Sequence, residues 1–158
     1  MEKLDVLRDH LARLLDWEDA HLGFDVVIEG IPPQLRGAQP RGLPYSAWQL
    51  LEHLRLCQRD ILDFCREPDY VDPHSMEEYW PEAASPPTPE AWDRSVADFR
   101  ADREALKKLA GEIDLFAVVP RGTGQTYLRE IVLVADHNAY TLGQLVVLRR
   151  LLGNWTAS

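Results

Sequence analysis

Two histidines, His53 and His137, have the surroundings of inward-facing helical residues. Each has apolar neighbours three and four positions away, the spacing at which side chains share one face of a helix. Rings on facing helices can meet in a bundle core, where rigid backbones hold imidazoles in a preset geometry for a metal ion. The neighbours are Leu50, Leu56 and Cys57 for His53, and Leu133, Val134, Tyr140 and Thr141 for His137. The chemistry predicted from the two histidines is divalent-metal binding.

A metal site of this kind needs a further ligand, because catalytic zinc takes three protein ligands and keeps one position open. His21 is the best remaining histidine, since the second half of the first predicted helix packs in the bundle. His74 lies in a predicted loop, and His10 is flanked by charged residues. Spacing alone favours the alternative, in which two core histidines are satisfied by carbonyls or carboxylates.

The two cysteines, Cys57 and Cys65, do not form a disulfide pair. They are eight residues apart on one predicted helix, which corresponds to about 12 Å of rise and is too far for a bond between them. The spacing of a cysteine-rich zinc site is also missing. Both are therefore predicted to be reduced and to pack as small buried hydrophobic residues in a cytosolic protein.

Capping signals place the helices that carry the two histidines. Ser46 and Gln49 form a capping box, in which each side chain satisfies the other residue's backbone N–H, and they begin a helix over residues 47–66. Thr126 caps the last helix, which is predicted to run over residues 127–152 and to stop at a glycine.

Two further helical patterns complete the set. Apolar residues at spacings of three and four over residues 4–29 predict one helix or a pair of helices, ended by the prolines at 32–33. Thr88, followed by a proline, begins another helix. Gly111 is predicted to close it as a left-handed cap.

The segments between the helices carry turn signals. Residues 34–45 and 81–89 are rich in proline or glycine and predict loops. The run 115–119 resembles a strand but is too short to support a sheet. The glycines of 120–125 predict a tight turn and lack the spacing and lysine of a phosphate-binding loop. The predicted fold is all-α, an antiparallel four-helix bundle with long interhelix loops that forms a single domain over residues 1–158.

The last helix has the highest apolar density of the four. Residues 131–135 are an unbroken apolar run, and no charged residue occurs between His137 and Leu148. A helix without a polar face must be covered on more than one side. The segment is therefore predicted to supply both the bundle core and a homodimer interface.

The overall charge bears on partners and location. The chain has 26 Asp and Glu against 17 Lys and Arg, a formal net charge of −9, which argues against binding a nucleic-acid backbone. No apolar run approaches the length of about 18 residues that a membrane span needs, so we expect no membrane segment. The charged N-terminus lacks the pattern of a signal peptide, and a cytoplasmic protein is expected.

Three segments resemble one known family. They are SAWQLLEHLRLCQRDILDF at 46–64, EEYWP at 77–81, and LREIVLVADHNAYTLGQLVVLRRLLGNW at 128–155. Together they are similar to the DinB-like superfamily, and the resemblance extends over nearly the whole chain. It implies a four-helix bundle, commonly dimeric, related to bacterial thiol-dependent S-transferases and mycothiol-dependent isomerases.

The resemblance also implies a metal site. In the family, one histidine on the second helix joins a pair of histidines on the last helix in the pattern HxxYHxGQ. The corresponding residues are His53 and His137, and Tyr140, Gly143 and Gln144 match the pattern as well. Position 141 departs from it, because Thr141 stands where the family has the third histidine. A neutral hydroxyl is a poor ligand for such a metal.

The departure leaves alternatives open. The metal site is vacant, or His21, a water or a group of the ligand completes it. Aromatic residues are expected to line a pocket at one end of the bundle, from Trp48, Trp80, Tyr45 and Tyr140. Each of the tryptophans is equally compatible with core packing, and Tyr45 also fits a staple against the start of its helix. Gln144 is a candidate for orienting a ligand.

Two functions follow from these residues. The first is a metal-dependent enzyme, with Zn or Ni as the divalent ion, that activates a small thiol as a nucleophile in the manner of the thiol S-transferases, although Thr141 weakens metal binding. The second is a non-catalytic dimeric bundle that binds a small molecule or a protein partner. The acidic charge disfavours a nucleic-acid binder.

Overall fold

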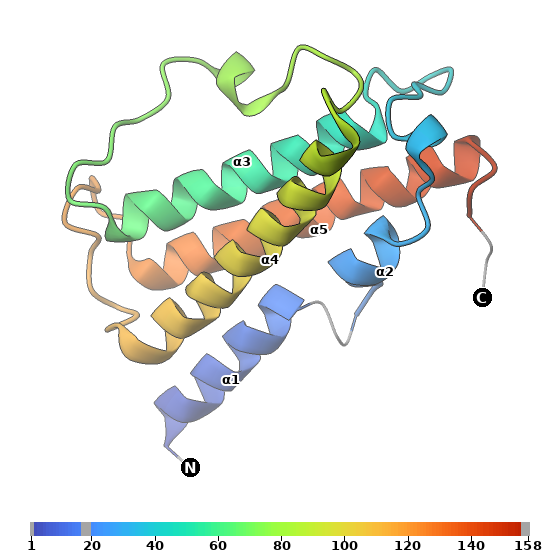
Figure 1. Cartoon of the computed structure of the whole chain (residues 1–158). Coiled ribbons are helices and arrows are strands. Elements are labelled where there is room, and N and C mark those ends of the chain that lie inside the picture. The colour runs from blue at the N-terminus through green and yellow to red at the C-terminus, as the bar shows by residue number, and fades with distance from the viewer. Residues whose placement is uncertain (1, 17–19, 156–158) are drawn as a thin grey trace.

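The computed structural model describes residues 2–16 and 20–155, and the regular secondary structure of this part of the chain consists of helices joined by long connections (Figure 1). Its α-helices are α1 (Lys3–Asp16), α2 (Phe24–Ile28), α3 (Ala47–Arg66), α4 (Pro89–Glu112) and α5 (Tyr127–Leu151), and its 3-10 turns are η1 (Pro33–Leu35) and η2 (Met76–Tyr79). Within the described residues the run 115–119 forms no strand and contributes only an isolated bridge between Val118 and Thr126. The predicted all-α class is confirmed.

The helix starts agree with the capping signals. The Ser46 side chain accepts from the backbone N–H of Gln49, whose own side chain accepts from the backbone N–H of Ser46, so the capping box is complete. The Thr88 and Thr126 side chains cap α4 and α5, and each accepts one backbone N–H. These bonds form within a few residues of one another, which is why the sequence predicts them.

The predicted end of α4 is wrong. The helix continues through Gly111 to Glu112 and ends at Ile113, whose backbone is extended and whose N–H donates to the Leu109 carbonyl. Gly111 is not among the described glycines with positive φ. A left-handed cap reverses the chain sharply, whereas here the chain leaves the helix in an extended direction and needs no such residue.

The first helical pattern forms a pair of helices, one of the two predicted alternatives. α1 ends at Asp16, and α2 begins at Phe24 after Gly23, whose backbone is extended. Residues 17–19, inside the predicted pattern, lie outside the described residues.

Long helices α3, α4 and α5 form the centre of the molecule. α3 contacts both α4 and α5, α1 packs against α4 and α5, and α2 packs against α5 (Figure 1). One core cluster takes side chains from all of these helices. Its largest fully buried members include Leu15, Phe24, Leu50, Leu51, Leu54, Leu62, Phe99, Leu106, Ile131, Leu142 and Leu145. The arrangement is compatible with a helical bundle.

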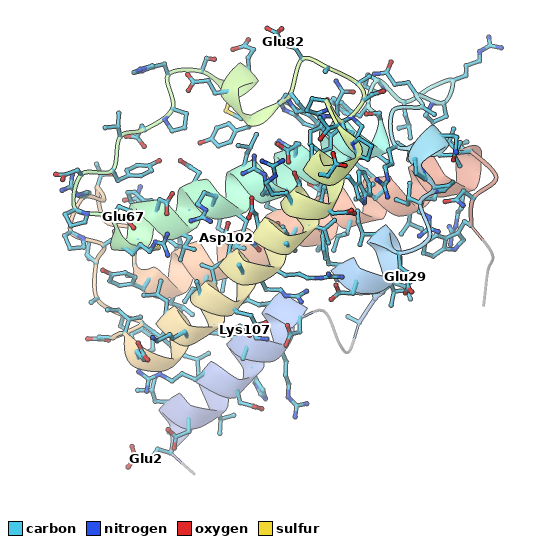
Figure 2. All side chains as sticks on the ribbon, viewed as in Figure 1. Glu2, Glu29, Glu67, Glu82, Asp102 and Lys107 are labelled. Carbon is cyan, nitrogen blue, oxygen red and sulfur yellow. The ribbon has the colours of Figure 1, made fainter. Side chains whose placement is uncertain are left out.

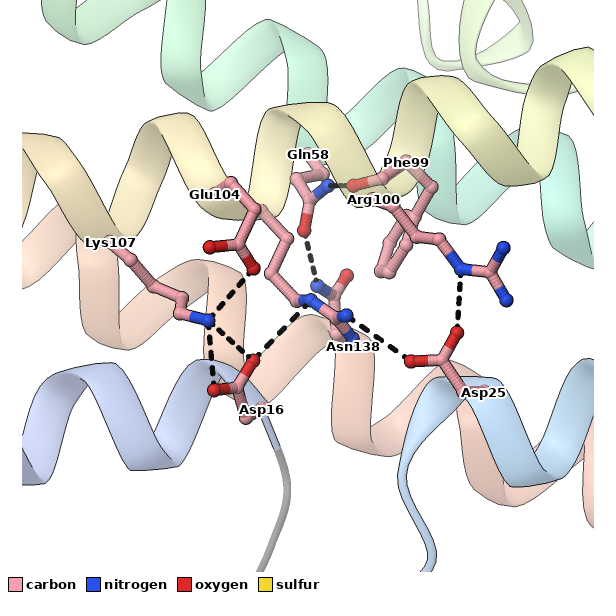
Figure 3. A network of polar contacts seen from close by, with 9 residues as sticks. Asp16, Asp25, Gln58, Phe99, Arg100, Glu104, Lys107 and Asn138 are labelled. Carbon is pink, nitrogen blue, oxygen red and sulfur yellow. Dashed lines mark hydrogen bonds and ion pairs between the residues drawn. The ribbon is translucent and has the colours of Figure 1, made fainter.

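A short chain of buried amides connects α3, α4 and α5 (Figure 3). Gln58 Nε2 donates to the Phe99 carbonyl at 2.8 Å, and Asn138 Nδ2 donates to Gln58 Oε1 at 3.0 Å. Both side chains are 1% exposed, so these bonds replace water in the core. They fix how the three helices are rotated toward one another.

Ion pairs attach the first two helices to α4. Asp16 of α1 pairs with Arg103 and Lys107, and Asp25 of α2 pairs with Arg100 and Arg103 (Figure 3). Burial alone would raise the pKa of Asp25, but the hydrogen bonds from Arg100 and Arg103 outweigh it and lower that pKa. The contact therefore favours the charged carboxylate.

Most acidic side chains lie on the outside. Glu2, Glu29, Glu67 and Glu82 project outward from the ribbon and are exposed (Figure 2).

Helix α5 is long enough and apolar enough to cross a membrane, judged by its length and composition alone. Its most apolar window is 44% buried within the protein, however, and core helices of soluble proteins meet the same criterion.

The amide chain gives a first testable prediction. Gln58→Leu leaves the Phe99 carbonyl and Asn138 without their buried partner, so the free energy of unfolding should fall by about 1–3 kcal/mol. The double variant Gln58→Leu/Asn138→Leu removes the stranded amide and should recover part of that loss. Urea denaturation followed by circular dichroism measures both, and equal stability of the single variant and the parent protein would contradict the prediction.

Candidate metal centre

His53 of α3 and His137 of α5 meet across the helix interface. Their Nε2 atoms are 3.0 Å apart, and the rings are inclined at 65° to each other. His53 is 9% exposed, and His137 is partly buried. The structure thus brings together the two histidines that the sequence placed on inward faces.

The backbone of the α3–α4 connection orients His53. The Nδ1 atom of His53 lies 3.1 Å from the Tyr79 carbonyl oxygen, which only accepts hydrogen bonds. Nδ1 therefore carries the proton, and Nε2 presents its lone pair toward His137. In the absence of a metal, His137 donates to that lone pair, so the two rings satisfy each other. A metal-ligating histidine is held in the same way, by a carbonyl on its other nitrogen.

Cys57 is a third donor beside the two imidazoles. Its Sγ atom lies 3.6 Å from Nδ1 and 3.9 Å from Nε2 of His53, and the donor atoms of His53, Cys57 and His137 all lie within 4.8 Å of one another. The prediction of Cys57 as an inert buried residue is corrected: it is partly buried and faces the histidines. The available signal was its i, i+4 spacing from His53, which puts both side chains on one face of α3.

The donor set fits a divalent ion. Zinc binds imidazole nitrogen at about 2.0–2.1 Å and thiolate sulfur at about 2.3 Å, so two nitrogens on one tetrahedral ion are about 3.3 Å apart. The observed separation of 3.0 Å between the Nε2 atoms is close to that value. Nitrogen and sulfur together suit zinc and nickel. The group could therefore hold a metal ion with three protein ligands.

The other two candidate positions are placed differently. His21 lies exposed in the bend before α2, with Nδ1 3.1 Å from the Leu22 carbonyl oxygen, and is outside the donor group. The sequence placed it in the second half of the first helical pattern, whereas it belongs to the connection between α1 and α2. Thr141 is 1% exposed and does not line the cavity beside the histidines. Cys57, from α3, is the third donor instead of either residue.

A cavity of about 500 Å³ lies beside the histidines. The predicted pocket residues Tyr45, Trp80, Tyr140 and Gln144 line it, together with Cys57, Asp60, Ile61, Met76, Tyr79 and Leu133. Trp48 does not, and its placement corrects the prediction: it is 5% exposed in the hydrophobic core, and its backbone N–H donates to the Arg36 carbonyl. As the second residue of α3, it lies on the buried face of that helix.

Stacked aromatic rings form one wall of the cavity. The Trp80 ring lies 3.8 Å from the His53 ring and 4.3 Å from the Tyr45 ring, nearly parallel to both. The segment that carries Trp80 is tied to the start of α3, because Gln49 Nε2 donates to the Pro81 carbonyl at 3.2 Å. The helix cap, the connection and the imidazole are thus held as one unit.

The chain was compared with family models, curated proteins and solved structures. No family model, curated protein or solved structure matches it. The resemblance to the DinB-like superfamily therefore stays a prediction.

Burial determines the protonation of the three donors. It lowers the pKa of both His53 and His137, and it raises the pKa of the Cys57 thiol to about 12. At neutral pH without a metal, both imidazoles are neutral and available as ligands, while the thiol keeps its proton. A metal that binds through Cys57 must displace that proton.

The raised pKa of Cys57 gives a second prediction. In Cys65→Ser protein treated with a chelator, alkylation of Cys57 by iodoacetamide should be slow at pH 8. The rate should keep rising about tenfold per pH unit beyond pH 9, because only the thiolate reacts. Mass spectrometry measures the rate, and the same protein in urea provides the unperturbed thiol. A native rate that levels off near pH 9 would contradict the shift.

Proposed function

We propose that this protein is a metal-dependent enzyme of the DinB-like type, in which His53, Cys57 and His137 bind one zinc or nickel ion. The observation that carries the proposal is the convergence of these three donor atoms beside a cavity of about 500 Å³. Three protein ligands and an open side are the composition of catalytic zinc sites. We further propose that α1, α3, α4 and α5 correspond to the antiparallel four-helix bundle of that superfamily.

In this proposal, Cys57 replaces the ligand that the family pattern places at position 141, where this chain has Thr141. The family pattern places two ligands one turn apart on the last helix, and here the pair one turn apart is His53 and Cys57 on α3. In this proposal the third ligand has moved from α5 to α3, and the site keeps its donor count with a thiolate in place of an imidazole. A thiolate is the softer ligand and suits zinc or nickel.

Each part of the site has a task in this proposal. A divalent ion at the three donors would supply Lewis acidity, lowering the pKa of a ligand's thiol or hydroxyl group. The Tyr79 carbonyl holds the tautomer of His53 through Nδ1, and Trp80 keeps that ring in place by stacking. Gln144 and Tyr140 line the same cavity, where they can orient a small thiol or another nucleophile.

The second candidate is a non-catalytic bundle that binds a small molecule. The observation that favours it is the chain of hydrogen bonds from His137 through His53 to the Tyr79 carbonyl, which leaves both rings satisfied with no ion. Metal content separates the two candidates.

The third prediction concerns the metal ligands. Protein purified without a histidine tag or chelator should contain about one divalent ion per chain by elemental analysis. Loss of a residue that only holds a metal ligand in place typically lowers metal affinity about 10–100-fold. Cys57→Ala removes a direct ligand, so it should lower the affinity by more than that. Zinc affinity measured by competition with a chromophoric chelator gives the value.

Two matched variants complete this test. Cys65→Ala removes the other thiol of α3, and Thr141→Val removes the hydroxyl at the family's third position. Both should leave metal affinity within a few-fold of the parent protein. Sub-stoichiometric metal that is unaffected by His53→Ala or Cys57→Ala would favour the non-catalytic bundle.

We also propose that the protein forms a homodimer through α5. Exposed apolar residues form a row along one face of this helix: Val132 (43% exposed), Tyr140 (73%), Val147 (45%) and Leu151 (54%). Gly143 lies in the middle of this face, and a Cβ there would meet nothing within 4 Å. The bare glycine allows a second helix to approach closely.

Charges on the same face indicate how a second copy would pack. Asp136 and Arg150, both exposed, are seven residues before and seven residues after Gly143. When two copies of α5 cross antiparallel at Gly143, the Asp136 of each copy faces the Arg150 of the other. A twofold interface has this self-complementary form.

The fourth prediction tests that packing. Asp136→Arg should shift the protein toward monomers, because it sets like charges opposite each other, and Asp136→Arg/Arg150→Asp should restore the dimer. Light scattering after size-exclusion chromatography measures the mass. Asp93→Arg, on the exposed side of α4, should have no effect. A parent protein that is monomeric at micromolar concentrations would refute the interface.

A further inference from the structure

The described lining of the cavity beside the histidines contains one carboxylate, that of Asp60. Asp60 of α3 lines the cavity, and its Oδ1 and Oδ2 accept hydrogen bonds from the Tyr70 and Tyr79 hydroxyls, each at 2.8 Å. Among the described residues it forms no ion pair with lysine or arginine. A carboxylate has about four lone-pair sites, so two remain for a further donor.

The residues that line this cavity include no lysine or arginine. Arg59 and Arg129 each line a neighbouring cavity together with Asp60, but both are already engaged: Arg59 pairs with Asp102 at 2.6 Å, and Arg129 pairs with Glu130 at 2.7 Å. An anionic group placed beside Asp60 would meet that carboxylate and no lysine or arginine of the lining.

The other lining residues are mainly apolar or aromatic. Ile61 and Leu133 belong to α3 and α5, and Tyr79 and Met76 belong to the connection that covers them. Apolar walls with a few polar groups are typical of small-molecule sites. Aromatic rings also attract organic cations. The cavity therefore combines an apolar interior with one negative group at its side.

We propose that this cavity selects an organic amine in its ammonium form, with the ammonium group at Asp60 and an apolar body against Ile61 and Leu133. The proposal rests on the proposed function in taking the cavity as its ligand site, but the charge preference itself requires no metal. The ammonium donates to the free lone pairs of Asp60, while the tyrosine hydroxyls hold the carboxylate in place. Phosphorylated and carboxylated ligands of the same size are disfavoured.

Three probes of nearly equal shape test the charge preference. They are 2-phenylethylamine, 2-phenylethanol and 3-phenylpropionate, titrated into the full chain and followed by amide chemical shifts in NMR spectra. The amine should bind at least tenfold more tightly than the alcohol, and the acid should bind most weakly. Shifts should concentrate at α3, α5 and η2. Equal affinities for amine and alcohol, or no amine binding at millimolar concentration, would overturn the proposal.

A variant of Asp60 assigns the effect. Asp60→Asn keeps an oxygen for the tyrosines but removes the charge, so amine affinity should fall to that of the alcohol while alcohol affinity stays unchanged. Asp9→Asn, on the exposed side of α1, makes the same change in net charge and should alter neither affinity. If Asp60→Asn does not fold, the comparison of probes on the parent protein still decides.

The titration is repeated with zinc-loaded protein and with chelator-treated protein, so that a failure of the ammonium site can be distinguished from a failure of the metal centre. Metal binding through Cys57 without amine selectivity would overturn this inference alone. If the protein selects the amine but binds no metal, the missing metal binding overturns the metal centre, and the ammonium site stands.

Discussion

One buried amide pair determines where the candidate site forms. Gln58 and Asn138 bond each other inside the core, and Gln58 also donates to the Phe99 carbonyl of α4. Asn138 is the residue next to His137, and Gln58 is the residue after Cys57. A rotation of either helix that broke the amide bond would also separate the donors. The directional bond in the core thus specifies a contact that apolar packing alone leaves adjustable.

The segment between α3 and α4 contacts residues of α3 that line the cavity. Its Tyr79 supplies the carbonyl that orients His53, its Trp80 stacks on that ring, and the Tyr79 hydroxyl reaches Asp60. Tyr79 therefore contacts both His53 and the carboxylate, and its neighbour Trp80 contacts His53 as well. Any ligand that moves Tyr79 changes the hydrogen bond to His53 as well, so occupancy of the cavity and the basicity of Nε2 are physically linked.

Local signals in the sequence predicted the helix starts and the inward faces of His53 and His137, because caps and helical spacing depend on residues within one or two turns. Contacts made by connections were not predictable in this way. His21 was expected in the packed second half of the first helical pattern but lies in the α1–α2 connection. Trp48 was expected in a pocket because aromatic residues line small-molecule sites, but it lies in the core, the alternative that the sequence left open. Cys57 was missed because a lone cysteine more often packs as a small hydrophobic residue.

Two carboxylates, Asp102 of α4 and Asp60 of α3, illustrate why burial alone does not identify a binding group. Asp102 is 3% exposed, and its bond to Arg59 supplies the positive charge that a buried carboxylate requires. Burial still raises the pKa of Asp102, and its Oδ2 has no hydrogen-bond partner among the described residues, but Asp102 does not line the cavity and so offers nothing to a ligand there. Asp60 instead faces the cavity and is held by neutral hydroxyls. Burial and the bonds to Asp60 raise the pKa of both Tyr70 and Tyr79, so these hydroxyls remain donors, and the negative charge stays open to a cation from outside.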